Sequence, residues 1–600
     1  MDIPFIANHL TMQNIINCYV KETGEGDWKH VEEVSIPIED QSIKQVLVIS
    51  FKRQSVTLYI PVRYQSVTER HLFAPRMFYQ IKNDEMIQLD YMTLMAFMQK
   101  EFVLANNQSV QADELMLRTI LSYQNIKRII SHRSSDLDEC YQIEKTFLQS
   151  EQSLLIGHQV HPTPKSRQGI DEDEEHIFSP ETKGAFQLHY FQAVQDIVDE
   201  DSALPQSASL LIKEELKKDP FVTQAFKDQY CQEDHFSLIP IHPLQARKLL
   251  GREDVCVLIE LGKLTYLGPQ GREFYPTSSV RTVYHPEAGY MYKFSIPVRI
   301  TNSLRINKRK ELSRGVEVSR LLQSEVSEKL NEYHPSFRVM EDPAYMTLKL
   351  AVEETGFEVV IRENPFQDGK ESRTTLLAAL CQDHITGEAS HLANIINQLA
   401  NDEKISVAQA SEQWFAEYLK VSLRPMYWLY HTYGIALEAH QQNSIIQLDE
   451  QGYPELFYYR DNQGYYFTES KAEVLKQIVS TLNEKSDTIC SDLIAEERFR
   501  YYVFFNHLFG LVNAFGVNRL INERRLLSMI KEELLDLNKL FGDDTNLLTS
   551  LLHEEKLPCK GNLLTRVYDM DELEGSLETQ SIYVHVSNPL AVLAGERHGI

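Results

Sequence analysis

No segment of this sequence repeats another at a fixed period, and no tract has low complexity. Solenoids, propellers and other repeat architectures are therefore excluded. The chain has 600 residues, more than one hydrophobic core usually organises, so an irregular fold of two to four domains is expected. Hydrophobic residues at 43% and aromatic residues at 10% are typical of a folded globular chain.

Charge and cysteine usage narrow the classes of function. Sixty Lys and Arg residues against 86 Asp and Glu give a net charge of −26, which argues against nucleic-acid binding. Seven scattered cysteines never form C-x-x-C, so we expect reduced thiols in a cytoplasmic protein. The start "MDIPFIANHL" lacks a signal-peptide pattern. The apolar stretch "VFFNHLFGLVNAFGV" from Val503 is short and contains polar residues, so it predicts a buried helix and no membrane span.

Hydrophobic periodicity divides the chain into three segments. Residues 1–150 combine strand alternation in "KQVLVISFKRQSVTLYIPVRY" with helical patterns in "YMTLMAFMQKEFVLA" and "ADELMLRTILSYQ". Short strands dominate residues 151–388, with turn signals at "GPQGRE" and "HPEAGY". Helices return in residues 389–600, interrupted by a predicted hairpin in "SIIQLDEQGYPELFYYRDNQGYYF". The pattern by itself predicts a mixed, α+β fold.

Several common motifs are absent. The chain has no G-x-x-x-x-G-K-[ST], G-x-G-x-x-G, H-E-x-x-H or G-x-S-x-G. The usual phosphate loops, dinucleotide folds, zincins and α/β-hydrolase elbows are therefore unsupported. If the protein uses ATP, it binds the phosphates with an uncommon set of residues.

The strongest positional signal is "KFSIPVRITNSLRIN", Lys293–Asn307. Strand alternation places apolar side chains on one face and a cationic, hydroxyl-rich strip on the other: Lys293, Ser295, Arg299, Thr301, Ser303 and Arg305. Its length predicts a break near Asn302. The upstream "PTSSVRTVYH" repeats the pattern with Ser278, Ser279, Arg281 and Thr282. Such strips bind phosphates or carboxylates, although the solvated face of a sheet has the same composition.

Cations and backbone breakers are concentrated in "GHQVHPTPKSRQG", Gly157–Gly169, just before the acidic tract "DEDEE". Its glycines and prolines predict an extended loop at a domain boundary. The loop would present a set of cationic side chains to a phosphate: His158, His161, Lys165 and Arg167.

Hard oxygen ligands gather in two further stretches, "LEAHQQNS" and "YYRDNQGYY". Mg²⁺ prefers carboxylate oxygens together with substrate phosphates, so Glu438 or Asp461 is a candidate ligand. A helix C-cap followed by a polar turn explains the same residues equally well. The His-Pro of "IPIHPLQ" and the Arg-Glu of "VVIRENPF" are each interpreted as structural when taken alone.

In order along the chain, "GHQVHPTPKSRQG", "IPIHPLQ", "PTSSVRT", "KFSIPVRITNSLRIN", "IRENPF", "EAHQQNS" and "RDNQG" resemble the motifs of the IucA/IucC family of NRPS-independent siderophore synthetases. The resemblance covers residues from about 150 to 590 and ends in "NLLTRVYD" and "VSNPL". Two departures are visible: Gln159 replaces a proline of the first motif, and Leu244 replaces a tryptophan after the second His-Pro. Neither change removes a charged or ligating group.

The resemblance implies a cupped hand of thumb (1–150), fingers (151–388) and palm (389–600), with antiparallel sheets and a helical C-terminal region. It implies an acid–amine ligase, commonly dimeric, that adenylates a carboxylate with ATP and passes the acyl group to an amine. "NCYVKETGEGDW", "EQSLLIGH" and "GYPELFYYRDNQGYYF" are most similar to members that use citrate and spermidine.

The cationic residues and the resemblance together give the expected site. The expected ATP-binding residues are His158, His161, Lys165, Arg167, Ser279, Arg281, Thr282, Lys293, Gln442 and Asn443. The expected citrate-binding residues are Ser279, Arg281, Thr301, Arg305 and His440. The expected catalytic residues are Lys293, Arg305 and His440, and the expected magnesium ligands are Glu438 and Asp461, without a choice between these two carboxylates.

Three alternatives remain open at this point. The same reaction type fits another amine, such as a diamine, ornithine, lysine or a hydroxamate-bearing amine, or another carboxylate, such as 2-oxoglutarate or a citryl monoamide. A kinase-like phosphotransferase fits "YRDNQG", although the Gly-rich loop is missing and the product would be ADP in place of AMP. A non-catalytic protein that binds an anionic metabolite or a siderophore would keep the same cationic strip.

Overall fold

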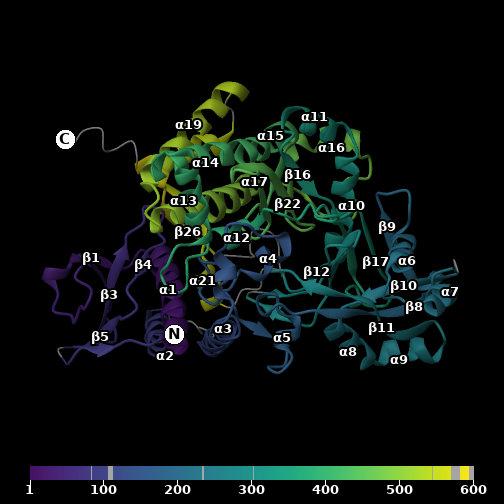
Figure 1. Ribbon diagram of the computed structural model, residues 1–600, viewed down its shortest axis with the longest axis horizontal. Helices are drawn as coiled ribbons and strands as arrows, with labels where there is room; N and C mark the ends of the chain where they lie inside the picture. The colour runs from purple at the N-terminus through teal and green to yellow at the C-terminus, as the bar shows by residue number, and fades with distance from the viewer. Residues whose placement is uncertain are drawn as a thin grey trace.

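The chain folds into several sheets surrounded by helices. The computed structural model describes residues 1–82, 84–105, 112–232, 235–301, 303–542, 545–568 and 582–592. Figure 1 shows the N-terminal sheet at the left, the largest sheet at the right and the C-terminal helices along the top. The predicted break near Asn302 and the last residue of "NLLTRVYD" lie outside the described residues.

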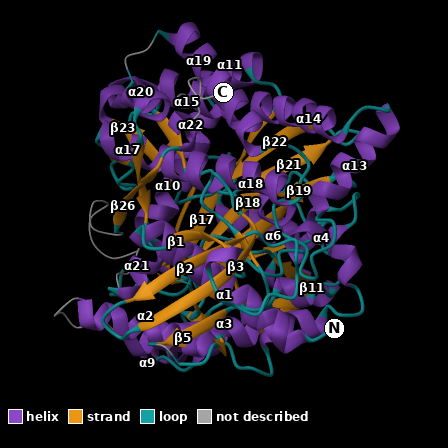
Figure 2. Cartoon of the chain, turned by 90° about the vertical axis from the view of Figure 1, so that its left-hand side faces the viewer, coloured by secondary structure: helices purple, strands orange, loops and turns teal. Residues whose placement is uncertain are grey.

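The N-terminal sheet packs beside α1 (Ile3–Thr23) (Figure 2). The helix begins after Asp2, whose carboxylate accepts a hydrogen bond from the Phe5 amide at 3.1 Å, and ends at Gly24 in the left-handed conformation. The predicted strands and helices of this region are confirmed. They are β2 (Gln45–Phe51), β3 (Val56–Tyr64), α2 (Tyr91–Ala105) and α3 (Ala112–His132). The region also contains β1 (Asp27–His30), β4 (Leu72–Phe73), β5 (Phe78–Ile81), β6 (Ile87–Gln88) and α4 (Phe147–Gln152).

The largest sheet has eight strands in the order β10-β8-β11-β12-β13-β18-β17-β9, all antiparallel. Its strands are β8 (Phe186–Val194), β9 (Val198–Ser202), β10 (Phe236–Ile241), β11 (Leu264–Pro276), β12 (Thr282–Tyr284), β13 (Tyr290–Phe294), β17 (Ala344–Leu348) and β18 (Val359–Glu363). The turn predicted at "HPEAGY" is confirmed between β12 and β13. The turn predicted at "GPQGRE" is wrong, because this stretch lies inside β11, where the glycines accompany shifts of register.

The predicted long strand from Lys293 is shorter than expected. β13 ends at Phe294, and two short strands, β14 (Arg299–Ile300) and β15 (Ser303–Leu304), form a separate sheet with β7 (Arg167–Gln168). Pro297 lacks the N–H that a continued ladder needs, which accounts for the interruption. Lys293 and Ser295 are as buried as the apolar face, so the solvated-face alternative is wrong for these two residues.

The C-terminal part combines two small sheets with most of the helices. The four-stranded sheet contains β16 (Phe337–Met340), β19 (Thr374–Leu376), β21 (Ser444–Leu448) and β22 (Pro454–Arg460), and the three-stranded sheet contains β20 (Ile435–Leu437), β23 (Tyr465–Thr468) and β24 (Ile489–Cys490). The helices are α10 (Arg309–Leu322), α11 (Glu325–Tyr333), α12 (Leu377–Leu380), α13 (His391–Glu403), α14 (Val407–Val421), α15 (Leu423–Tyr433), α16 (Ala472–Ile478), α17 (Asp492–Phe499), η6 (Arg500–Leu508), α18 (Phe509–Val517), α19 (Glu523–Phe541), α20 (Asn546–His553), α21 (Asn562–Val567) and α22 (Pro589–Val592).

The predicted hairpin is confirmed in β21 and β22, which pair antiparallel. The helix expected to end at "LEAHQQNS" ends earlier, at Tyr433, and β20 intervenes. Glu438 and His440 therefore follow a strand, and the helix C-cap alternative is wrong. Gly434, in the left-handed conformation after α15, ends the helix and lets the chain turn into β20.

Three large hydrophobic cores lie in the N-terminal sheet, in the eight-stranded sheet and among the C-terminal helices. They do not follow chain order: Leu563 of α21 joins the N-terminal core, and Phe337 of β16 joins the C-terminal one. The boundaries at 150 and 388 remain predictions. The apolar stretch from Val503 forms the buried helices η6 and α18, as expected. Within the described ranges, no helix has the length and apolar character needed to cross a bilayer.

Candidate active site

Every predicted site residue lines a cavity of about 260 Å³. The cationic strip enters from β13 and the segment around β14 and β15, while the carboxylates follow β20 and β22. Segments far apart in sequence thus bring cations and carboxylates to one space. Their proximity does not assign the role of each residue, so those roles stay predictions.

Lys293 is the buried cation on the largest sheet. Its Nζ lies 3.2 Å from Asp461 Oδ1 and also donates a hydrogen bond to the Asn462 side-chain oxygen. Burial lowers the pKa of Lys293 to about 8, although the charge of Asp461 opposes this shift. The charge of Asp461 therefore favours the ammonium form of Lys293 against the effect of burial.

Asp461 is held as an anion. Burial alone would raise its pKa, but the charges of Lys293 and Arg362 keep the pKa well below its ordinary value. Its Oδ1 accepts hydrogen bonds from two backbone amides, those of Asn462 at 2.7 Å and Gln463 at 3.2 Å. Its Oδ2 accepts one from Asn443 Nδ2 at 3.1 Å.

Glu438 lies nearby but in a different electrostatic state. Burial and the charge of Asp461 raise the pKa of Glu438 to about 7. The Tyr466 hydroxyl donates to Glu438 Oε2 at 3.0 Å, and His440 Nε2 lies 3.8 Å from Oε1. A Cβ on Gly464 would lie 2.5 Å from Glu438 Cβ and 3.0 Å from Asp461 Oδ2. The glycine therefore lets the chain pass between the two carboxylates.

These two carboxylates fit a magnesium ion whose remaining ligands come from substrate. No cluster of three or more His, Cys, Asp or Glu side chains suited to a metal occurs in the described part of the chain. Mg²⁺ commonly takes only one or two protein carboxylates together with phosphate oxygens and water. Glu438 and Asp461 both face the cavity and match that pattern.

Arg281 and Arg305 place two guanidinium groups on the cavity. Arg281 donates to the Ile306 carbonyl at 3.1 Å and to Gln463 Oε1 at 3.2 Å. Burial, and then the charge of Arg305, lowers the pKa of Arg281 to about 10. Arg305 Nη2 donates to Thr301 Oγ1 at 3.2 Å, so the two predicted citrate contacts are neighbours. Two adjacent guanidiniums of which one lowers the pKa of the other form a region ready for an anion.

The loop between β11 and β12, which carries Ser278 and Ser279 and is called the serine loop, is held in place by a buried ion pair. Glu151 of α4 accepts a hydrogen bond from the Ser278 amide at 2.7 Å and pairs with Arg460 at 2.5 Å. Ser279 Oγ accepts a hydrogen bond from the Thr282 amide at 3.1 Å. The loop therefore has a fixed shape, with Ser278, Ser279 and Thr282 all lining the cavity.

Two cations of the loop "GHQVHPTPKSRQG", which the sequence predicts to bind phosphate, form ion pairs with carboxylates of the protein. Lys165 forms a buried ion pair with Glu181, and Arg167 Nη2 donates to Glu181 Oε1 at 2.6 Å. Arg167 also lies 3.5 Å from Glu175, the last residue of the acidic tract. Glu181, together with the last residue of the acidic tract, thus compensates the two cations of the loop. His158 remains close to the site through its Nε2, which lies 2.7 Å from Asn506 Nδ2.

Sequence reasoning missed several residues of this cavity. They come from η6, β25 (Lys556–Lys560) and α21, namely Tyr501, Tyr502, Asn506, Lys560 and Asn562. The one available signal was the set of polar side chains inside the apolar stretch after Arg500. Arg362, interpreted as structural from sequence, also lines the cavity while making two 2.7 Å bonds to Asp342. The His242 of "IPIHPLQ" caps α8 (Pro243–Leu250) and does not line it, which agrees with the structural interpretation.

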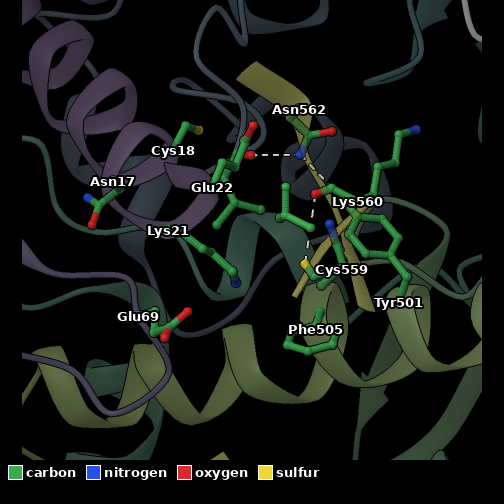
Figure 3. A pocket seen from close by; sticks show the side chains of 13 residues that line it. Asn17, Cys18, Lys21, Glu22, Glu69, Tyr501, Phe505, Cys559, Lys560 and Asn562 are labelled. Atoms are coloured by element: carbon green, nitrogen blue, oxygen red, sulfur yellow. Dashed lines mark hydrogen bonds between the residues drawn. The ribbon is translucent and has the colours of Figure 1, made fainter. Parts of the chain in front are cut away.

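A small side pocket adjoins the cavity, because Tyr501, Lys560 and Asn562 line both. Figure 3 shows Lys21 and Glu22 of α1 facing these residues across the pocket. Glu22 accepts hydrogen bonds from the backbone amides of Leu563 and Leu564, at 2.8 Å each. The pocket thus marks where α1 is fastened to the start of α21.

Comparisons with known proteins agree with this architecture. The profile of the "IucA / IucC family" matches residues 146–382, and that of the "Ferric iron reductase FhuF-like transporter" matches residues 412–575. The spermidine-citrate ligase of Bacillus anthracis is 46% identical over 98% of this chain and 98% of its own. The rhizobactin siderophore biosynthesis protein RhbC of Rhizobium meliloti is 34% identical, and 97% of each chain is covered.

Among solved structures, the ATP-bound aerobactin synthetase IucA from a hypervirulent pathotype of Klebsiella pneumoniae superimposes with a TM-score of 0.87 at 26% identity. The match covers 97% of this chain and 99% of that one. The expected fold class, α+β with antiparallel sheets and a helical C-terminal region, is confirmed by this superposition.

Proposed function

The chain belongs to the IucA/IucC family, and we propose that it is the ligase that joins citrate to a primary amine of spermidine in siderophore biosynthesis, at the expense of ATP. The Bacillus anthracis relative that is 46% identical to this chain is a spermidine-citrate ligase. The observation that carries the proposal is the single cavity in which Lys293, Arg305 and the two carboxylates meet.

The first step is adenylation. A citrate carboxylate oxygen attacks the α-phosphorus of ATP, the bond from that phosphorus to the bridging oxygen breaks, and pyrophosphate leaves to give citryl-AMP. Citrate and ATP are both polyanions, so their approach requires preorganised cations. Lys293, Arg281 and Arg305 supply these charges, and a bidentate guanidinium suits a citrate carboxylate.

Magnesium would be held by Glu438 and Asp461 beside the phosphates. When bound, the ion neutralises phosphate charge in the adenylation step. Of the two carboxylates, Asp461 is the stronger candidate because its low pKa keeps it ionised at neutral pH.

The second step forms the amide. A deprotonated primary amine attacks the acyl carbon of citryl-AMP, the bond to the AMP oxygen breaks, and AMP leaves with that oxygen. An alkylammonium has a pKa near ~10, so the amine must lose a proton before it attacks. Tyr501 and Asn506 also line the cavity and are candidate contacts for the incoming amine.

Two further features of the proposal concern the protein as a whole. We place it in the cytoplasm, because all seven cysteines are free and six of them are buried. We expect a homodimer, as the family resemblance implies.

The test is mass spectrometry of reactions that contain the protein, MgATP and citrate, with spermidine in one reaction and other amines in parallel ones, while AMP and ADP are quantified. Citryl-spermidine with one AMP per product is the expected result. AMP formation only with another amine would keep the ligase class and replace spermidine. ADP formation, or no nucleotide turnover, would contradict the ligase.

A further inference from the structure

A second cavity, of about 120 Å³ and partly open to solvent, lies on the eight-stranded sheet away from the catalytic one. It is bounded by β8, β11 and β13 of that sheet, by α6 (Ala208–Lys218) and by the turn between β12 and β13. Figure 1 shows α6 and the strands β8 and β11 at the right-hand end of the molecule. The two cavities share no lining residue.

The cavity has the chemistry of a cation site. Three carboxylates line it, from Glu215, Asp219 and Glu287, against the cations Arg272 and Lys218, which leaves one uncompensated negative charge. The rings of Phe274 and Tyr292, 5.8 Å apart, supply aromatic wall. Carboxylates beside aromatic rings recognise organic ammonium groups.

Two buried phenols supply an independent observation. Tyr190 and Tyr292 are only 4% and 3% exposed, and both line the cavity. Across the described ranges, neither hydroxyl makes a hydrogen bond to protein. A buried phenol usually has a partner, so the cavity is where these two oxygens would find one.

The carboxylates are fixed in place by the backbone around them. Glu215 Oε2 accepts a hydrogen bond from the Gly289 amide at 2.8 Å, and a Cβ at Gly289 would lie 2.8 Å from Glu215 Oε1. Asp219 Oδ2 accepts one from the Arg272 amide at 2.8 Å. Both acidic groups are therefore held before any ligand arrives, as in a preformed site.

We propose that this cavity binds the ammonium group of a small primary alkylamine. The ammonium group can donate three hydrogen bonds. The phenol oxygens of Tyr190 and Tyr292 and the carboxylate of Glu215 can accept them. Tyr292 precedes Lys293 on β13, and successive side chains of a strand point to opposite faces. An amine bound here would therefore contact the strand that carries Lys293, from the face opposite the catalytic cavity.

The inference is tested by isothermal titration of the full chain with propylammonium chloride, without ATP or citrate, so that turnover plays no part. The double variant Tyr190→Phe/Tyr292→Phe keeps both rings and removes both acceptors. We expect it to bind at least tenfold more weakly, because hydrogen bonds to a charged group are lost. Tyr275→Phe, which alters the other face of β11, is the matched control and should bind as the wild type does.

A second variant tests the proposal even if the double variant fails to fold. Glu287 is 72% exposed at the rim, so Glu287→Gln leaves the core intact and should weaken binding about threefold. Sodium propionate, an anion of the same size, should not bind at this site. Equal affinity of the wild type and both cavity variants would overturn the proposal, since any amine bound would then occupy the catalytic cavity alone.

Discussion

Two carboxyls in one cavity have pKa values shifted in opposite directions, because the charges of neighbouring cations outweigh burial for only one of them. Lys293 and Arg362 depress the pKa of Asp461, whereas burial and the charge of Asp461 itself raise that of Glu438 to about 7. The same comparison explains Lys293, which keeps its charge through Asp461. At the scale of single residues, the state of each group is thus set by the balance between burial and the charges of its neighbours.

Replacing Lys293 or Arg305 with alanine should abolish adenylation and leave the fold intact. Each removes a cation that offsets the repulsion between two polyanions, so citrate-dependent pyrophosphate release should fall by a factor of about 100 or more. Lys310→Ala, which breaks an exposed pair with Asp487, is the matched control. Wild-type pyrophosphate release from either active-site variant would contradict the roles given to these residues.

Asp461→Asn should raise the Mg²⁺ requirement more than Glu438→Gln does. Asp461 is the carboxylate that is ionised before metal binds, so its loss removes the stronger ligand. Pyrophosphate release measured against free Mg²⁺ at fixed ATP should show a half-saturating concentration raised by about tenfold or more in Asp461→Asn. A larger shift in Glu438→Gln would reverse the assignment.

The short helix α4 shows how one element can position a loop of the candidate active site to which it does not belong. Glu151 lies on α4, its partner Arg460 ends β22, and Ser278 belongs to the loop between β11 and β12. Arg460 Nη2 also donates to Ser278 Oγ at 3.3 Å. A single fully buried carboxylate therefore holds elements of the eight-stranded and four-stranded sheets together beneath the serine loop.

Glu151→Ala should lower the free energy of unfolding by about 3 kcal/mol, because it leaves the buried Arg460 charge without its carboxylate. Urea unfolding followed by circular dichroism measures this change. Glu417→Ala, which breaks an exposed pair with Lys420, should change the same quantity by less than about 0.5 kcal/mol. Equal effects of the two substitutions would show that the buried pair does not hold these elements together.

At the scale of the whole molecule, two buried carboxyls fasten the N-terminal region to the C-terminal helices. Glu22 of α1 binds the first amides of α21, and Glu523 of α19 accepts a hydrogen bond from the Val67 amide at 2.8 Å. Burial raises the pKa of each to about 7, against the hydrogen bonds they accept. The attachment of the N-terminal region to the C-terminal helices thus involves carboxyls that ionise near neutral pH.

The sign of the resulting pH dependence follows from these shifts. A carboxyl with a folded-state pKa above its unfolded value binds more protons when folded, so its contribution is complete below about pH 4.5 and is lost as pH rises through about 7. The thermal midpoint of unfolding should therefore decrease as the pH rises from 5 to 7.5. Each group lowers the free energy of unfolding by up to ~1.4 kcal/mol per pH unit. Glu22→Gln/Glu523→Gln should flatten this slope; an unchanged slope would exclude the two carboxyls as its source.

The sequence by itself determined the classes of residue in the site and most of the elements that carry them. Strand alternation located Lys293, Thr301 and Arg305, and ordered motifs located Glu438 and Asp461. Both signals depend only on residues that are close together in the sequence. All of these line one cavity. The superposition with a solved structure confirms the fold class that the motifs implied.

Only the tertiary structure decided which charges are compensated and which segments close the site. Lys165 and Arg167 face Glu181, and Lys560 reaches the cavity from β25. Such pairings join residues that are distant in sequence or differ in their side-chain direction, so no local pattern encodes them. Whether a cation is available to a substrate depends on its partners after folding, since burial and a nearby carboxylate set both its charge and its exposure.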